Sequence, residues 1–318
     1  MPLPLVIVAG PTAVGKSDFA IELAKRINGE VISADSMQVY KGMDIGSAKI
    51  TPEEMQGIKH YLIDVLDPTE VFNVATFKEL AQAAITEITA KGKIPIVAGG
   101  TGFYIQALLY DIDFSESLGE NQEYRNFLLK EYSEKGAEYL FERLKEVDPE
   151  TAGIIHMNDE KRVVRALEFY HETGKPISVH NKEQYEKSSD YNFAYFVLND
   201  VREKIYHKID ARVDIMVEKG LVDEVKALQA KGLNVKDVSM QGLGYKEILM
   251  YLNDEISLDE AVYRIKRDSR HFAKRQIIWF KREKEVIWLN KYDFDDDMSR
   301  ILDYSLKVLK DKSIIKDY

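Results

Sequence analysis

Hydrophobic and polar positions are arranged in blocks along this chain, and the first two blocks predict a strand followed by a helix. Residues 3–9 form a short apolar run, which is typical of a buried strand in a parallel sheet. Over residues 17–27 the apolar positions recur at helical spacing and predict an amphipathic helix. The residues between these blocks therefore form a turn that leads from a strand into a helix.

The alternation of strand and helix continues. Residues 30–33 are predicted to form a second strand, residues 76–91 a helix, and residues 94–98 a third buried strand. Strands that alternate with helices are joined by crossovers, which favours a parallel sheet. The carboxyl ends of these strands then lie at one edge of the sheet.

Beyond residue 110 the pattern becomes charged and helical. Helices are expected near residues 120–133, 137–145 and 159–172, then a hinge or loop at residues 175–176 and 180–190, and a strand over 193–198 that returns to the sheet. Between residues 201 and 231 apolar positions recur about every four residues, with a break at Gly220, and a last helix follows residue 295.

The turn after the first strand carries the clearest chemical signal. Residues 10–17, GPTAVGKS, consist of two glycines that flank four residues, followed by lysine and a hydroxyl residue. In this setting Gly10 and Gly15 let successive backbone N–H groups face one point, where the helix N-terminus also favours an anion. Lys16 would reach the outer phosphate and Ser17 would bind a magnesium ion. A glycine-rich turn that matches by chance is the alternative.

This phosphate loop sets the predicted architecture. The fold class is α/β, a parallel sheet flanked by helices of the type found in P-loop nucleotide kinases, with an inserted helical subdomain. The predicted boundaries are residues 1–112 and 194–318 for the P-loop core and residues 113–193 for the insert.

Two polar side chains follow the second and third strands. Asp35 comes directly after one strand, and Thr101 stands in the Gly99–Gly102 turn after the other. Because ligands of open α/β sheets bind beyond the carboxyl ends of the strands, both side chains are expected beside the phosphate loop. Asp35 could instead cap a helix or stabilise a turn, and Thr101 could cap the helix that follows it.

Charge is unevenly distributed. The 318 residues carry a formal net charge of −10, which on its own argues mildly against a nucleic-acid partner. Residues 261–284, however, hold nine Lys or Arg residues against two acids. Basic and aromatic side chains in this segment suit contact with a nucleic-acid backbone, although a partly buried helix with long basic side chains explains the string equally well. Arg162 and Arg165 form either a second basic face or a solvated surface.

Three chemistries are compatible with the phosphate loop. In a kinase that uses ATP, Asp35 would be the base for a small hydroxyl acceptor. If diphosphate is instead the leaving group, the loop, magnesium and Arg212 would neutralise its charge while carbon is transferred to a nucleophile. A nucleotide-driven binding switch is the third possibility. Composition and spacing alone leave these open.

The chain also resembles a known enzyme family. Six strings occur in the order found in tRNA dimethylallyltransferases: GPTAVGKS, ISADSMQVYKGMDIGSAK, GGTGFY, NDEKRVVRALE, SMQGLGYKEI and AKRQIIWFK. The likeness extends from Leu5 to about Leu289. It implies transfer of the dimethylallyl group from dimethylallyl diphosphate to the exocyclic amine of adenosine at tRNA position 37, with release of pyrophosphate.

The resemblance also implies the roles of individual residues. Asp35 would accept the amine proton, with Thr101 near the reacting groups and Arg212 on the diphosphate. The diphosphate-binding residues would be Gly10, Thr12, Ala13, Val14, Gly15, Lys16 and Ser17, with Ser17 as the magnesium ligand. The residues implied to contact tRNA are Asp35, Ser36, Met37, Gln38, Thr101, Arg125, Lys161, Arg162, Val163, Val164, Arg165, Gln241, Gly242, Gly244, Tyr245, Lys246, Lys274, Arg275, Gln276, Trp279 and Lys281.

The resemblance and the composition also predict the cofactor, the binding partners and the cellular compartment. We expect Mg²⁺ as the cofactor and the tRNA anticodon stem-loop as the partner, gripped partly by the inserted subdomain. The chain contains no cysteine, so disulfides and thiolate metal sites are excluded. With no apparent signal peptide or membrane span, we expect a cytoplasmic monomer without a membrane partner.

Overall fold

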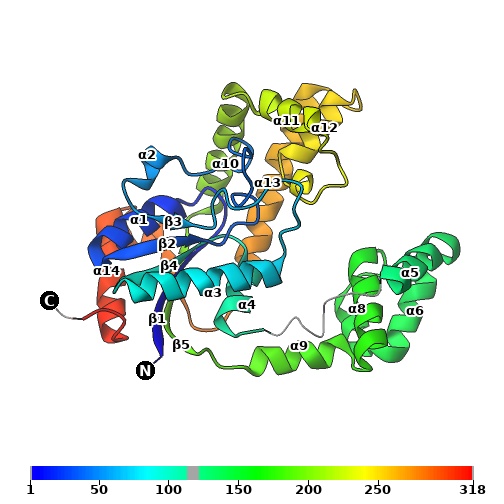
Figure 1. Ribbon diagram of the computed structural model, residues 1–318, viewed down its shortest axis with the longest axis horizontal. Helices are drawn as coiled ribbons and strands as arrows, with labels where there is room; N and C mark the ends of the chain where they lie inside the picture. Colours follow the sequence, from blue (N-terminus) through cyan, green and yellow to red (C-terminus); the bar gives the residue numbers. More distant parts are fainter. Residues whose placement is uncertain (1, 113–121, 317–318) are drawn as a thin grey trace. The chain divides into compact units, whose positions relative to one another are not determined.

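A parallel sheet of six strands forms the centre of the larger of two compact units (Figure 1). The computed structural model describes residues 2–112 and 122–316. Unit 1 consists of Met1–Leu108 and Asp190–Tyr318, and unit 2 of Leu109–Ser189. The strands are β1 (Leu3–Ala9), β2 (Gly29–Ser33), β3 (His60–Tyr61), β4 (Ile94–Gly99), β5 (Tyr191–Asn199) and β6 (Val286–Asn290).

The sheet has the order β3-β2-β4-β1-β5-β6, and every pairing of neighbouring strands is parallel. β1 lies in the interior, where Val6 is opposite Ile96 on one side and Ala194 on the other. The predicted α/β class and parallel sheet are therefore confirmed. The edge strands β3 and β6 were not predicted, because β3 has only two residues and most of β6 is partly exposed, so neither gives a clear apolar run.

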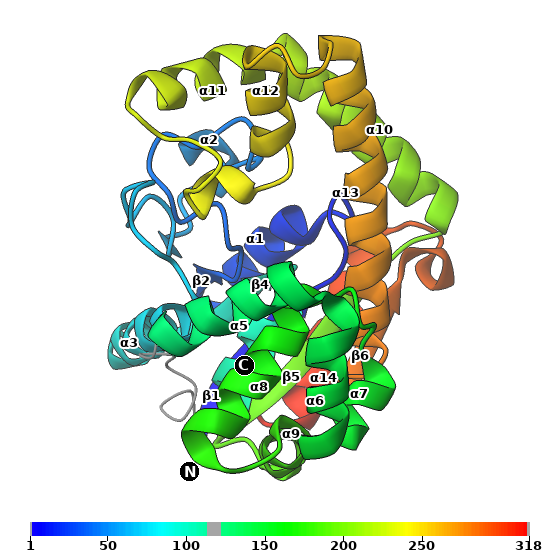
Figure 2. The same cartoon turned by 90° about the vertical axis from the view of Figure 1, so that its right-hand side faces the viewer.

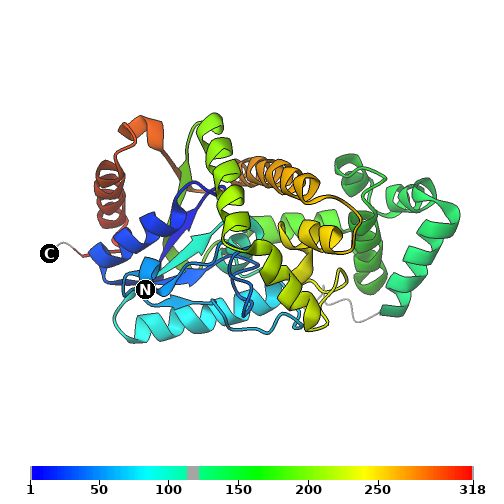
Figure 3. The same cartoon turned by 90° about the horizontal axis from the view of Figure 1, so that it is seen from above.

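The helices of unit 1 are α1 (Lys16–Ile27), α2 (Pro52–Met55), α3 (Val74–Ala90), α4 (Gly102–Leu109), α10 (Arg202–Glu218), α11 (Leu221–Ala230), α12 (Tyr245–Leu252), α13 (Leu258–Phe280) and α14 (Met298–Asp311). Of these, α1 and α3 pack on β2 and β4, and α14 packs on β5. α1 buries Phe19 and Leu23 in a cluster that includes Ile301 of α14, and the two helices lie side by side (Figure 3). The break expected at Gly220 separates α10 from α11.

The long helices α10 and α13 pack against each other (Figure 2). Two ion pairs link them, Arg270 with Asp210 at 2.5 Å and Lys266 with Asp214 at 2.5 Å. Two basic side chains in the first part of α13 thus serve the contact between the helices, whereas Arg264 and Arg267 pair with carboxylates of α13 itself.

Unit 2 is a separate helical bundle. Its helices are α5 (Gln122–Lys135), α6 (Ala137–Val147), α7 (Pro149–Ile154), α8 (Glu160–Thr173) and α9 (Ile177–Glu186). Leu128, Leu140, Leu144 and Leu167 form the centre of its core. The predicted first helix, 120–133, begins at two residues that lie outside the described part of the chain. Within the described residues, no helix is long and apolar enough to cross a membrane.

The loop predicted over residues 180–190 is wrong for most of its length, because α9 extends to Glu186. The inward side of α9 carries Ser178 and His180 in place of large apolar residues, so the helix has no apolar stripe that a sequence pattern would detect. The Ser178 N–H donates a hydrogen bond to Asp148 at 2.9 Å, which anchors the start of the helix.

One partly buried carboxylate fixes the loop that follows β2. Glu224 of α11 accepts hydrogen bonds from the backbone N–H groups of Asp44 (2.9 Å), Ile45 (2.7 Å) and Gly46 (3.0 Å). The Tyr245 hydroxyl donates to the same carboxylate at 2.8 Å. Burial, followed by the negative charge of Glu224, raises the pKa of this tyrosine. Gly46 lies so close to the Tyr245 ring that a Cβ atom would be 2.6 Å from it.

We predict that Glu224→Ala lowers the free energy of unfolding by about 2–4 kcal/mol, because three N–H groups and one hydroxyl lose their acceptor. Urea denaturation measures the loss, and hydrogen exchange of the amides of residues 44–46 measures where it occurs. Glu218→Ala, at an exposed position of α10, is the matched control and should change stability by less than about 0.5 kcal/mol. Equal stability and equal exchange in the two variants would contradict this role.

Candidate active site

The phosphate loop has the backbone conformation that its sequence predicts. Gly10 and Gly15 have φ angles of +146° and +96°, and a Cβ atom on Gly10 would lie 2.4 Å from the Leu198 carbonyl oxygen of β5. Both positions therefore require glycine. α1 begins directly after Gly15, without a side-chain cap, so its first N–H groups are available to an anion.

Two contacts hold this loop in place. Ala13 is packed against Ile205 and Ile209 of α10 and Ala273 of α13. The side-chain amide of Gln276 accepts a hydrogen bond from the Thr12 N–H (2.9 Å) and donates one to the Gly100 carbonyl (2.9 Å). The loop after β1 and the turn after β4 are thus joined through one buried side chain.

Lys16 folds back over the loop, and its ammonium donates to the Pro11 carbonyl at 2.8 Å. Burial lowers the pKa of Lys16 to about 8, the negative charge of Asp35 opposes this shift, and Arg212 adds to it. Lys16, Asp35 and Arg212 therefore lie within electrostatic range of one another.

Arg212 is on the side of α10 that faces these groups. Although its side chain keeps access to solvent, partial burial lowers its pKa, and the carboxylates of Asp18, Glu54 and Asp35 oppose that shift. The guanidinium forms no hydrogen bond or ion pair with any described residue. It is therefore available to bind an anion on the loop.

Asp35 and Thr101 lie at adjacent strand ends. The Ala34 N–H donates to the Ala98 carbonyl at 2.8 Å, and the Thr101 N–H donates to the Ala34 carbonyl at 3.3 Å. The Asp35 Oδ1 atom accepts from the N–H groups of Met37 (2.8 Å) and Gln38 (3.3 Å). One Asp35 oxygen thus fixes the turn while the carboxylate stays beside Lys16. A role of Asp35 in the turn is therefore compatible with a role in the chemistry beside the phosphate loop.

The sequence also left open whether Thr101 caps α4. Its carbonyl accepts from the N–H groups of Tyr104 and Ile105, but its hydroxyl makes no hydrogen bond with the described part of the chain. The hydroxyl is therefore not used as a helix cap here.

The turn at residues 35–38 contacts the segment before α12. A Cβ atom on Gly242 would be 2.5 Å from Met37 Cε, so the Met37 side chain lies directly on this glycine. Ser36, Met37 and Gln38 are partly exposed, and Gln241 and Lys246 are exposed. Tyr245 is fully buried, which gives it a packing and hydrogen-bonding role rather than a surface for RNA.

Exposed cations on α13 occur in its second part. Lys274, Arg275 and Lys281 are exposed, whereas Gln276 is buried, where its amide joins Thr12 to Gly100. Trp279 packs edge-on against Phe103, and a Cβ atom on Gly102 would be 2.2 Å from its ring. Of the residues expected to contact tRNA on this helix, the structure leaves the charged ones accessible.

In unit 2, α8 divides into a basic face and a core face. Lys161 and Arg162 are exposed, and the Arg162 side chain, 70% exposed, lies 3.4 Å from Asp159. Val163 and Val164 are buried in the core of unit 2, so their side chains pack against the protein rather than against RNA.

Arg125, also in unit 2, has a partner that the sequence did not reveal. Its guanidinium makes a two-point contact with buried Glu168, at 2.9 and 3.0 Å. Burial raises the pKa of Glu168, and Arg125 opposes this shift. This ion pair gives the buried Glu168 carboxylate a partner inside unit 2, and it limits how far the Arg125 side chain can extend into solvent.

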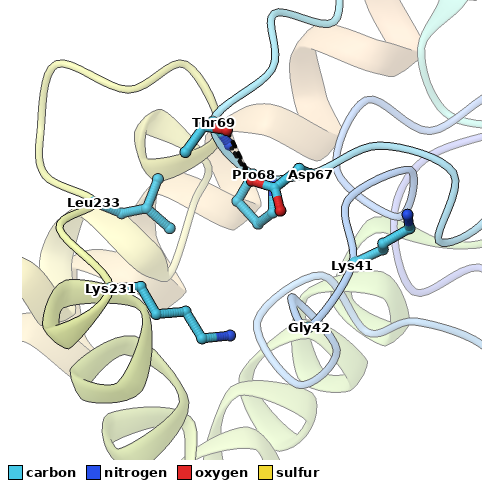
Figure 4. Close-up of a pocket in the computed structure, with 7 residues that line it drawn as sticks. All are labelled: Lys41, Gly42, Asp67, Pro68, Thr69, Lys231 and Leu233. Carbon is cyan, nitrogen blue, oxygen red and sulfur yellow. Dashed lines mark hydrogen bonds between the residues drawn. The ribbon is translucent and has the colours of Figure 1, made fainter.

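A separate pocket lies beside the loop after β3 (Figure 4). It has a volume of about 320 Å³ and is lined by Lys41, Gly42, Asp67, Pro68, Thr69, Lys231 and Leu233. Hydrogen bonds from Thr69, and then the charges of the two lysines, lower the pKa of Asp67. None of the predicted site residues lines this pocket, which is therefore distinct from the mouth of the phosphate loop.

Known proteins resemble this chain along almost all of its length. The sequence model of the family described as IPP transferase matches residues 38–283. A tRNA dimethylallyltransferase of Lachnoclostridium phytofermentans is 57% identical over 313 residues, which are 98% of this chain and 99% of the relative.

Solved structures of related enzymes also resemble this chain. A tRNA isopentenylpyrophosphate transferase from Bacillus halodurans has a TM-score of 0.72 and 43% identity, covering 98% of both chains. A eukaryotic dimethylallyltransferase, described as acting on tRNA, has a TM-score of 0.77 and 32% identity, covering 91% of this chain and 74% of the other. The match to the family model and the near-complete match to sequence relatives show that the chain belongs to the IPP transferase family.

Proposed function

We propose that this protein is a tRNA dimethylallyltransferase, which moves the dimethylallyl group from dimethylallyl diphosphate to the exocyclic amine of adenosine 37 in tRNA and releases pyrophosphate. The observation that carries the proposal is the cluster of Asp35, Lys16 and Arg212, coupled by charge at the mouth of a phosphate loop. The names of the relatives with which it shares family and fold support the same activity.

The proposed reaction needs two functions from this cluster, a proton acceptor and positive charge that stabilises the leaving diphosphate. An adenine amine is a weak nucleophile, so its proton must leave as the new C–N bond forms, and in this proposal the Asp35 carboxylate accepts that proton. The C–O bond to the diphosphate breaks in the same step, and negative charge grows on the departing oxygens. The N–H groups at the start of α1, Lys16 and Arg212 stabilise that charge.

Magnesium fits this site on the basis of its donor atoms. The Ser17 side chain is exposed at the start of α1, and its hydroxyl makes no hydrogen bond with the described residues. The described residues contain no group of three or more His, Cys, Asp or Glu side chains that could hold a metal by themselves. Mg²⁺ commonly binds through few protein ligands together with phosphate oxygens. When bound, it would neutralise charge on the diphosphate, with Ser17 as its protein ligand.

The proposed RNA contacts come from both units. In unit 1 they are the turn at residues 35–38, the exposed residues around Gly242, and the exposed cations of α13. In unit 2 they are the exposed basic residues of α8. We expect these groups to contact the anticodon stem-loop, where adenosine 37 can be unstacked and inserted into a pocket. We further expect the enzyme to act as a monomer in the cytoplasm.

The direct test mixes the protein with magnesium, unmodified tRNA and either dimethylallyl diphosphate labelled in the prenyl group or ATP labelled in its outer phosphate. We expect label on the RNA only from the prenyl donor, and mass spectrometry of digested RNA should find the added group on adenosine 37. Label on RNA only from ATP would overturn the proposal in favour of a kinase.

We predict that Asp35→Asn lowers kcat by at least about 100-fold, because the base is lost. The asparagine oxygen can still accept the N–H bonds of Met37 and Gln38, so the turn should persist. Loss of the carboxylate lowers the pKa of Lys16 further, so pyrophosphate binding is best compared near pH 6.5, where Lys16 stays protonated. A loss of pyrophosphate affinity as large as the loss of rate would contradict the role of base.

We predict that Arg162→Ala weakens tRNA binding and reduces the slope of log Kd against log salt by about one unit, because one phosphate contact is lost. Affinity is measured at several salt concentrations. Lys182→Ala in the same unit is the control, since its ammonium is paired with Glu150 at 2.6 Å. An unchanged slope for Arg162→Ala would mean that Arg162 is an ordinary surface residue.

A further inference from the structure

A second lysine lies against the phosphate loop. Lys291 is the first residue after β6, and β6 is separated from β1 by β5 alone, so Lys291 stands at the same carboxyl edge of the sheet as the loop. A Cβ atom built on Gly15 would be 3.2 Å from the Lys291 Nζ atom, which places this ammonium directly on the residue that precedes α1. Lys291 lies outside the segment matched by the family model, which ends at residue 283.

The Lys291 ammonium makes no hydrogen bond or ion pair with the described residues, whereas two neighbouring lysines are paired. Lys204 is paired with Asp296 at 2.6 Å, and Lys208 lies 3.4 Å from Asp200. Partial burial lowers the pKa of Lys291, and the positive charge of Lys208 adds to this, while Asp200, Asp296 and Asp18 oppose it. An ammonium that is partly removed from water without a partner is unfavourable, and a nearby anion would relieve this cost.

The backbone beside Lys291 favours an anion. The first N–H groups of α1 have no side-chain cap, and Gly15 leaves the approach to them open because it has no side chain. Lys16 contacts the loop at Pro11, whereas Lys291 contacts it at Gly15. The two ammonium groups thus approach the loop at different points.

We propose that Lys291 is a diphosphate-binding residue, a further cation of the phosphate loop beside Lys16 and Arg212. The identity of the ligand rests on the proposed prenyl transfer. Lys291 acts on binding of the diphosphate, through its charge, and has no part in removing the proton from adenosine.

The test is calorimetric titration of the full chain with inorganic pyrophosphate in magnesium buffer. Lys291→Ala should raise Kd by about tenfold, the equivalent of about 1.4 kcal/mol, and Lys291→Arg should recover most of the affinity because the charge returns. Lys307→Ala, an exposed lysine of α14, removes the same charge and should leave Kd unchanged. Melting temperature and tRNA affinity should be the same in all four proteins.

The outcomes separate the two proposals. If the wild-type chain binds pyrophosphate and Lys291→Ala binds it equally well, the role of Lys291 is overturned while the prenyl transferase proposal stands. If Lys291→Ala loses affinity together with melting temperature and Lys291→Arg recovers neither, Lys291 supports the fold only, which also overturns the inference. A wild-type chain that binds no pyrophosphate would overturn the diphosphate site itself, and Lys291 with it.

Discussion

The site depends on a phosphate loop that is held in shape before any ligand arrives. Backbone N–H groups stabilise an anion best when they already point at it, because no reorganisation is then needed. Here the amide of Gln276 fixes Thr12 on one side and Gly100 on the other, and Ala13 is packed between α10 and α13. Since Gln276 belongs to α13, the same helix that presents exposed cations also sets the position of the loop.

This preorganisation brings like charges together. Burial and then the positive charge of Arg212 lower the pKa of Lys16, and the negative charge of Asp35 opposes this shift. A bound diphosphate would add negative charge at the same place and raise the pKa of Lys16 from about 8. The site is therefore electrostatically incomplete without its ligand, and donor binding and full protonation of Lys16 reinforce each other.

Much of the fold and part of the site could be predicted from sequence, because both rest on local patterns. The phosphate loop is a contiguous motif, and Asp35 and Thr101 follow predicted parallel strands, so their meeting at one edge follows from topology. Glu224 and Lys291 could not be found in this way. Each acts on a loop far away in sequence, and on its own element each is one charged residue among many.

Burial also changed the meaning of several predicted residues. Gln276, Tyr245, Val163 and Val164 stand in strings that resemble tRNA-contacting segments, yet the structure buries all four side chains. A motif is a run of consecutive residues, whereas a helix directs to the core only the residues on one of its faces, which recur every three or four positions. Within such strings we propose the exposed charged residues as the RNA contacts, and the buried ones support the helix that carries them.

The distribution of charge explains how an acidic protein would bind the two polyanions of the proposed reaction, a diphosphate and tRNA. The chain has 54 acidic and 44 basic residues, whereas basic residues outnumber acidic ones in the segment 261–284. In the structure Arg264, Lys266, Arg267 and Arg270 are paired with carboxylates, so the first part of α13 presents little free positive charge. Lys274, Arg275 and Lys281 are exposed further along the same helix. Salt screens the electric field of these side chains beyond about 10 Å. Positive charge therefore needs to exceed negative charge only near the phosphate groups of the ligand. The net negative charge of the whole chain does not prevent binding at such a place.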